Sequence, residues 1–206
     1  MKNRTFKASI IIFPLIIGIL ITTSCGTPNE HAHDNKNGNE HSNDNHSDHE
    51  TTHEQNSSSP RKAAMSNVGD SHVHIDYSAP SVKGRKIWGG LVAYDQIWVT
   101  GAHKATSINF PNDVMIKDAK VSSGKYALFT IPSKSEWTLI LNKNWDQHLA
   151  DDYDQSLDIV RFKVNPEKIE QLHEQLTFDV KEKGGNTGSV SMSWEKLKIS
   201  FDFEVL

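Results

Sequence analysis

The chain has 206 residues, 36% of them hydrophobic and 23% charged, with a formal net charge of −4. This length allows one domain together with a polar tail. From residue 60 onward 18 basic residues face 19 acidic ones and no basic run occurs, so we exclude nucleic acid as an expected partner.

The first 24 residues have the layout of a lipoprotein signal peptide. Lys2, Arg4 and Lys7 precede an apolar run over 8–21, and the only cysteine, Cys25, follows small polar residues. The run of about 14 residues is shorter than the roughly 20 that a transmembrane helix needs. A small residue followed directly by Cys25 resembles the lipobox of bacterial lipoproteins, which implies export, cleavage after residue 24 and lipid attachment at Cys25. An ordinary secretory signal and a single membrane anchor are the alternatives.

A lipid on Cys25 makes the membrane an expected partner and places the rest of the chain in an extracytoplasmic space. Gly26 follows the cysteine, where Asp is the familiar signal for retention in the inner membrane. We therefore expect an anchor in the outer membrane of the cell envelope. A protein or small-molecule partner is left open.

Residues 25–59 are predicted to form a disordered tether. Seven carboxylates and one lysine give 26–59 a net charge of −6, and its only aliphatic side chain is that of Ala32. Such a segment cannot bury enough apolar surface to offset the entropy lost on ordering. We interpret it as a spacer between the membrane and the domain.

The tether is rich in side chains that bind transition metals. Neutral imidazole is a ligand for zinc, copper and nickel, and carboxylates can complete a coordination shell. The irregular spacing imposes no single geometry and predicts modest affinity. The alternative is a soluble spacer in which histidine is one more polar residue. The histidines concerned are His31, His33, His41, His46, His49 and His53.

From residue 60 the pattern predicts short strands separated by turns. Residues 72–77 alternate as a half-buried strand does, with Val73, Ile75 and Tyr77 on one side. After a turn at 81–84, we expect an irregular segment over 87–99 that ends in a short strand. Further strands are expected over 105–110, 114–121, 125–131, 136–142, 157–164, 176–180, 190–194 and 197–205, with a loop over 143–155, one helical turn over 167–173 and a loop over 184–188.

About ten short strands without a long helix predict an all-β domain over 60–206. The expected architecture is an antiparallel β-sandwich or jelly roll, with a flattened barrel as the alternative. Tryptophan and phenylalanine residues on these strands are interpreted as core. The alternative is an aromatic platform that stacks on sugar rings.

One strand presents a candidate metal site. His72, His74 and Asp76 share a face of the strand over 72–77, because side chains repeat every two residues. A further ligand would come from His103, His148 or Asp151. The alternative is the solvated face of a half-buried strand.

The loop over 144–154 is the candidate ligand loop. Trp145, His148, Asp151 and Asp152 concentrate an aromatic ring, an imidazole and carboxylates there. Paired carboxylates can hold calcium or perform acid–base chemistry, and loops on rigid β scaffolds often carry binding sites. The alternative is a solvated loop.

A series of sequence blocks spans the domain in a fixed order: 75–87, 90–94, 98–102, 105–106, 124–132, 137–142, 152–154 and 194–196. These blocks resemble a bacterial family known as domain of unknown function 2911. The resemblance implies a secreted or lipid-anchored protein without an assigned reaction. Within 98–106, Val99, His103 and Lys104 stand where the family pattern has Arg, Asn and Glu.

Together these patterns predict a non-catalytic lipoprotein of the cell envelope, in which the tether captures divalent transition metals. The alternative is a hydrolase, or a domain that binds a carbohydrate or another small ligand, with its site on the loop over 144–154.

Overall fold

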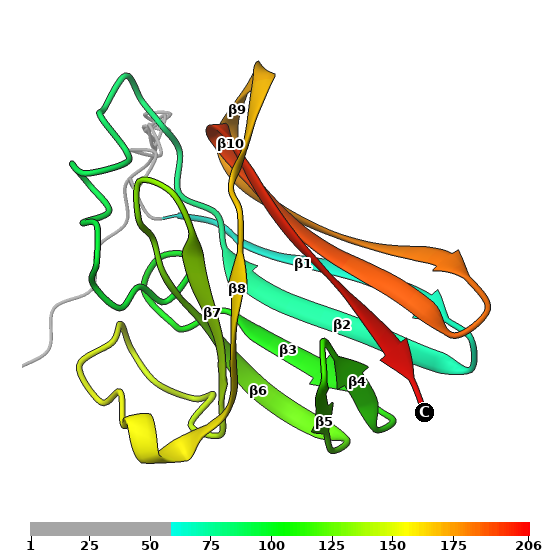
Figure 1. Cartoon of the computed structure of the whole chain (residues 1–206). Coiled ribbons are helices and arrows are strands. Elements are labelled where there is room, and N and C mark those ends of the chain that lie inside the picture. Colours follow the sequence, from blue (N-terminus) through cyan, green and yellow to red (C-terminus); the bar gives the residue numbers. More distant parts are fainter. Residues whose placement is uncertain (1–58) are drawn as a thin grey trace, which may run out of the picture. The chain divides into compact units, whose positions relative to one another are not determined.

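The computed structural model describes residues 59–206, which fold into an all-β domain (Figure 1). The one short helical element in this part is a 3₁₀ turn, η1 (Gln155–Leu157), and no helix here is long and apolar enough to cross a membrane. The strands are β1 (Arg61–Val68), β2 (Ser71–Ser78), β3 (Ser107–Phe110), β4 (Val114–Ile116), β5 (Ala119–Val121), β6 (Gly124–Ile131), β7 (Trp137–Asn142), β8 (Asp158–Val164), β9 (Glu167–Gly184) and β10 (Thr187–Val205).

The strands form two antiparallel sheets, as predicted for a β-sandwich. A six-stranded sheet has the order β1-β2-β3-β6-β7-β8, and a four-stranded sheet has the order β5-β4-β10-β9. Aromatic side chains contact one another between the sheets, and this contact buries the inner faces of both. The three contacting pairs are Tyr77–Phe178, Phe110–Phe203 and Phe162–Phe201, with ring centres 5.0, 5.4 and 5.1 Å apart.

The six-stranded sheet is also covered on its other face. Phe129 of β6 and Ile140 of β7 are buried in a second apolar cluster with Val99 and Ala105. Tyr153 covers this cluster, with its ring centre 5.1 Å from that of Phe129 in an edge-to-face contact. Burial on both faces explains why β6 and β7 read as nearly continuous apolar runs, and both strands were predicted within one residue.

The segment over 95–106 lies along the second half of β6, on the edge where β3 pairs only with the first half. The backbone of Trp98 exchanges two hydrogen bonds with Thr130, of 2.8 and 2.9 Å, and Leu128 N–H donates to the carbonyl of Thr106. Trp98 forms only an isolated β-bridge with Thr130. This described segment therefore lacks the short strand that was predicted at the end of 87–99. These bonds nevertheless hold the Trp98 side chain in a defined place.

The helical turn predicted over 167–173 is wrong, because these residues belong to β9. Ile169, Leu172 and Leu176 have the spacing of a helix face, but the backbone pairs with β10 through Lys168–Leu197 and Glu167–Lys198. The first half of β9 is largely exposed, so pairing with a long neighbour, and not an apolar face, determines its conformation.

β10 is one bent strand where two strands were predicted. Its ladder with β9 shifts register on both sides of Glu195, which has φ 55°. The bend brings the end of β10 back to the hairpin, where Val205 N–H donates to the carbonyl of Asn186 (Figure 1). Trp194 therefore lies at the bend, next to the residue with the unusual backbone.

Three smaller differences follow from local geometry. The predicted strand over 114–121 is two strands, β4 and β5, joined at Lys117, whose φ is 53°. The loop predicted over 184–188 is shorter, because β9 ends at Gly184 and β10 begins at Thr187. The edge strand β1 was not predicted, since its side chains are mostly exposed.

Candidate functional site

Four of the five tryptophans cluster at the end of the domain where β10 bends. The ring centre of Trp88 lies 4.8 Å from that of Trp137 and 5.7 Å from that of Trp194. Trp98 stacks on Trp194 with ring centres 5.9 Å apart and planes inclined by 21°. Trp137 and Trp194 are fully buried, as predicted for tryptophans on strands.

Only two of the four indole N–H groups in the cluster have a partner within the described part of the chain. Trp98 donates to the carbonyl of Gly101 at 2.9 Å, and Trp137 donates to the carbonyl of Ser133 at 3.0 Å. The buried indole nitrogens of Trp88 and Trp194 have none. Buried tryptophans usually satisfy this donor, so the cluster is unusual.

A cleft of about 570 Å³ opens beside this cluster, with Trp98 and Trp194 in its wall. Its size and its largely apolar lining are those of a site for a small molecule. The lining comes from the loop after β2, from the segment along β6, from one residue of the loop over 144–154 and from β10. The other apolar lining residues include Pro80, Leu91, Val92, Val99, Ala102 and Leu149.

The charged residues that line the cleft, among those described, are both basic: Lys83 and Arg85, with His103 beside them in the lining. Lys83 (φ 48°) and Gly84 (φ 67°) have the positive φ values that a type I′ turn requires, and Arg85 N–H closes this turn on the carbonyl of Val82 at 2.9 Å. The turn predicted at 81–84 is therefore present, one residue later. It places two cations at the cleft.

Backbone strain concentrates around the cleft. Seven described residues other than glycine have positive φ, and Lys83, His103 and Leu149 are among them and line the cleft. Thr100 (φ 53°) stands between two further lining residues. Such conformations cost of order 1–3 kcal/mol each and cluster at ligand sites. This concentration supports the cleft as the functional site.

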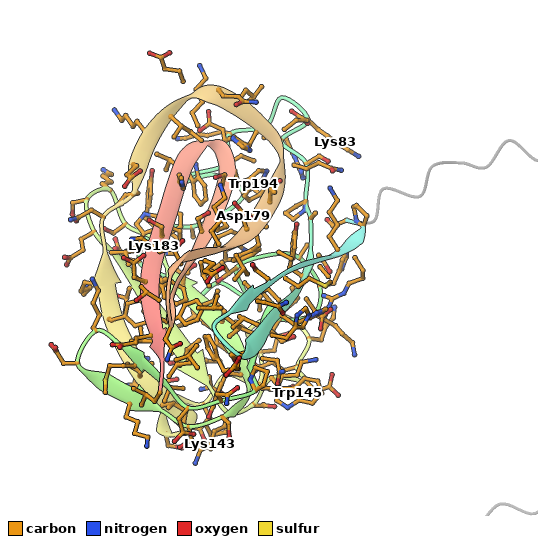
Figure 2. All side chains as sticks on the ribbon, turned by 90° about the vertical axis from the view of Figure 1, so that its right-hand side faces the viewer. Lys83, Lys143, Trp145, Asp179, Lys183 and Trp194 are labelled. Carbon is orange, nitrogen blue, oxygen red and sulfur yellow. The ribbon has the colours of Figure 1, made fainter. Side chains whose placement is uncertain are left out.

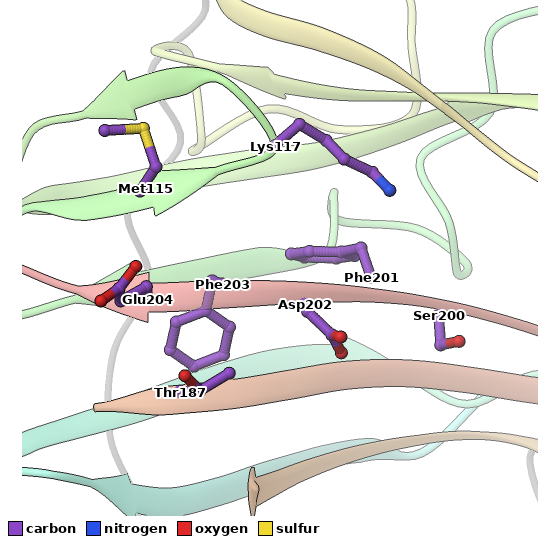
Figure 3. Close-up of a pocket in the computed structure, with 8 residues that line it drawn as sticks. All are labelled: Met115, Lys117, Thr187, Ser200, Phe201, Asp202, Phe203 and Glu204. Atoms are coloured by element: carbon purple, nitrogen blue, oxygen red, sulfur yellow. The ribbon is translucent and has the colours of Figure 1, made fainter. Parts of the chain in front are cut away.

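A second depression of about 350 Å³ lies along β10 (Figure 3). Asp202 and Glu204 face solvent there, while the rings of Phe201 and Phe203 belong to the core. Asp202 is already paired with Lys183 at 2.7 Å. This acidic groove lacks the exposed apolar wall that the cleft has.

The structure places His72, His74 and Asp76 on one face of β2, as the alternation predicted. His74 Nε2 lies 3.0 Å from Asp76 Oδ1, and Lys125 Nζ lies 3.4 Å from the other oxygen. Burial opposes ionisation of Asp76, but the bond from His74 and the nearby Lys125 outweigh it and lower the pKa of this carboxyl. His72 instead contacts Asn67 at 2.7 Å.

No group of three metal-ligating side chains occurs among residues 59–206. Three residues were considered as a further ligand for the site on β2. The rings of His103 and His148 lie next to each other, with centres 6.3 Å apart, and Asp151 is exposed. Metal binding on β2 stays a prediction. Cys25 and the six tether histidines lie outside the described residues.

The loop over 144–154 contributes to the cleft through Leu149 but not through the four residues predicted there. Trp145 is 41% exposed and lies under Lys125 Nζ, 4.4 Å from its ring centre. Figure 2 shows Trp145 near the lower end of the view, with Lys83 and Trp194 in its upper part. His148, Asp151 and Asp152 are exposed. The predicted ligand loop and the cleft are therefore largely different surfaces.

The residues that form the cleft were not proposed as a site from the sequence. Lys83 was interpreted as part of a turn and Trp98 as part of an irregular segment, and Arg85 was not proposed as a site residue. The available signal was the run 88–98, in which two tryptophans and a glycine pair occur without a strand pattern. Nothing in the spacing indicated that this run would meet Trp194.

Fold and site together define an antiparallel β-sandwich domain with a tryptophan-walled, cation-bearing cleft. The sequence model described as "Protein of unknown function (DUF2911)" matches residues 59–203, and the chain belongs to this family, as the resemblance indicated. A search of curated proteins and a search of solved structures found no match.

Proposed function

We propose that this chain is an exported lipoprotein of the cell envelope that binds a small ligand in the cleft of its β-sandwich domain and does not catalyse a reaction. The signal layout before Cys25 supports export and lipid attachment, with Gly26 favouring the outer membrane. The observation that carries the binding role is the cleft of about 570 Å³ walled by Trp98 and Trp194.

The polar and charged side chains that line the cleft support binding over catalysis. Gln175 Nε2 donates to Ser81 Oγ at 3.5 Å, and within residues 59–206 this hydroxyl has no hydrogen bond to a histidine. Lys83 and Arg85 are cations at neutral pH and are suited to holding a ligand in place. The alternative hydrolase site on the loop over 144–154 would need the exposed Asp151 and Asp152 to act on a substrate outside the cleft.

The binding role is tested by blocking the cleft of the full chain in detergent. The probes are 2-naphthoate and its neutral analogue 2-naphthamide, and the readout is quenching of tryptophan emission, with detergent alone as the blank. We expect saturable binding of at least one probe. Ala102→Phe should weaken it by about tenfold or more, since a side chain in the lining displaces the ligand.

The matched control is Ala63→Phe, which adds the same ring to the exposed strand β1 outside the cleft. This variant should bind as the parent protein does. If neither probe binds saturably, or if the two variants behave alike, the proposed function is wrong.

A second role is proposed for the tether, because six histidines fall within 23 residues among acidic neighbours. We expect this segment to capture zinc, copper or nickel with modest affinity, and to release them as imidazole is protonated near pH 6.5. Calorimetric titration should show binding by the full chain and its loss when all six histidines are replaced by asparagine.

The control for the metal experiment is the double variant His72→Ala/His74→Ala, which leaves the tether intact. If this variant alone loses metal binding, the site lies on β2 and the tether role is wrong. If the parent protein and the tether variant bind metal equally, the tether role is also wrong.

A further inference from the structure

The cleft differs in charge from the rest of the domain. Residues 60–206 carry slightly more acidic than basic side chains, yet the charged lining residues in the described part are the two cations Lys83 and Arg85. One carboxylate adjoins this surface: Glu174 Oε1 accepts the backbone N–H of Lys83 at 2.8 Å. Neither Lys83 nor Arg85 forms an ion pair among the described residues.

The guanidinium of Arg85 is held in place without being neutralised. Its Nε donates to the carbonyl of Val82 at 3.2 Å, and its Nη2 donates to the carbonyl of Ser81. Both acceptors are uncharged, and Nη1 has no partner within residues 59–206. A planar guanidinium with donors to spare is suited to a carboxylate, which it can bind through two hydrogen bonds.

The wall next to these cations is apolar and partly aromatic. The half-buried ring of Trp98 lines the cleft and stacks on the fully buried ring of Trp194, and the aliphatic side chains of Val99 and Leu149 continue the lining. A ring system can bury its faces against such a wall, whereas a compact inorganic anion cannot. The lining thus favours a ligand with an apolar body and one anionic group.

We propose that the cleft binds a small aromatic carboxylate, whose carboxylate pairs with Arg85 and Lys83 and whose ring lies against Trp98. This inference rests on the proposed binding function and names its ligand class. The groove along β10 gives a contrast within the same domain, because Asp202 and Glu204 there would repel an anion.

The test compares 2-naphthoate with 2-naphthamide, which has nearly the same shape without the charge, in the full chain in detergent. Quenching of tryptophan emission should show that the carboxylate binds at least about tenfold more tightly, as expected for a charge-assisted hydrogen bond. Arg85→Gln and Lys83→Gln should each reduce this preference, and added salt should weaken the binding of the carboxylate.

The matched control is Lys117→Gln. Lys117 is an exposed lysine with φ 53°, close to that of Lys83, but it lines the acidic groove and not the cleft. Its substitution should leave both affinities unchanged. If Lys117→Gln lowers the preference as much as Lys83→Gln does, the assignment to the cleft is overturned.

The failure of the ligand class is distinguishable from the failure of the binding function. If 2-naphthamide binds as tightly as 2-naphthoate, and Ala102→Phe weakens both, the cleft binds ligands but the anion proposal is overturned. If inorganic phosphate displaces 2-naphthoate at equal concentration, the aromatic part of the proposal is overturned. If neither naphthalene compound binds, both proposals fall.

Discussion

Trp98 and Trp194 stack on each other, with ring centres 5.9 Å apart, although they belong to opposite layers of the sandwich. The backbone of Trp98 is bonded to β6 of the six-stranded sheet, and Trp194 lies in β10 of the four-stranded sheet. The wall of the cleft therefore exists only when the two sheets are packed together. Ligand binding and folding of the domain should be coupled.

The two fully buried tryptophans should respond differently to substitution by phenylalanine. Trp137→Phe loses volume and the hydrogen bond to Ser133, whereas Trp194→Phe loses volume and a donor that has no partner among the described residues. We expect Trp137→Phe to lower the free energy of unfolding by about 1 kcal/mol more than Trp194→Phe does. Urea denaturation of both variants measures this difference, and equal losses would contradict it.

Asp76 should contribute stability that depends on pH. The pKa of Asp76 is lowered in the folded state, so its contribution is present above the unfolded pKa and is lost as the pH falls through the folded value. Because the pair with Lys125 is partly exposed, we expect Asp76→Asn to cost only about 0.5–1 kcal/mol at neutral pH. The cost should disappear in strong acid.

Denaturation of Asp76→Asn at several pH values checks this expectation. Asp151→Asn is the control, since Asp151 is exposed and forms no ion pair among the described residues. A difference from the parent protein that stays constant with pH would refute the role given to Asp76.

Gly188 is needed where the β9–β10 hairpin meets β1. A Cβ at this position would lie 2.5 Å from Phe203 Cζ and 2.8 Å from Val68 Cγ2. We expect Gly188→Ala to lower the free energy of unfolding by about 1–3 kcal/mol through this crowding. Ser189→Ala, at the next position, should change it by less than about 0.5 kcal/mol. Thermal unfolding distinguishes the two, and similar stabilities would contradict the steric argument.

Lipid attachment should depend on the single cysteine. Mass spectrometry of the protein extracted from membranes should find an N-terminus at Cys25 that carries acyl chains. Cys25→Ser should abolish this modification and release the protein from the envelope fraction. An unmodified N-terminus at Met1, or soluble protein cleaved elsewhere in the parent chain, would be incompatible with the lipoprotein assignment.

The fold class was predictable because the central strands carry a strong local signal. The runs Ala127–Ile131 and Trp137–Leu141 are apolar almost throughout, and this pattern fits strands covered on both faces. The first half of β9 carries no such signal, since Glu167 and Lys168 are exposed and their conformation depends on pairing with β10. Local spacing there favoured a helical turn, and tertiary pairing decided otherwise.

The candidate site was harder to predict than the fold because its parts are distant in sequence. Arg85, Trp98, Leu149 and Trp194 meet only after both sheets have formed. The sequence instead directed attention to dense local clusters, such as the loop over 144–154, where chemically active side chains are adjacent in the chain but mostly face solvent. Residues that are neighbours in the sequence therefore need not form a site, and residues that form a site need not be neighbours in the sequence.

The central claim is that a ligand binds in the cleft against Trp98, and nuclear magnetic resonance can test its location directly. The chain has five tryptophans, so the indole N–H signals can be assigned with one Trp→Phe variant each. On titration with 2-naphthoate, the signals of Trp98 and Trp194 should shift most, while that of the exposed Trp145 stays in place. A shift confined to Trp145 would contradict the account and place the site on the loop over 144–154.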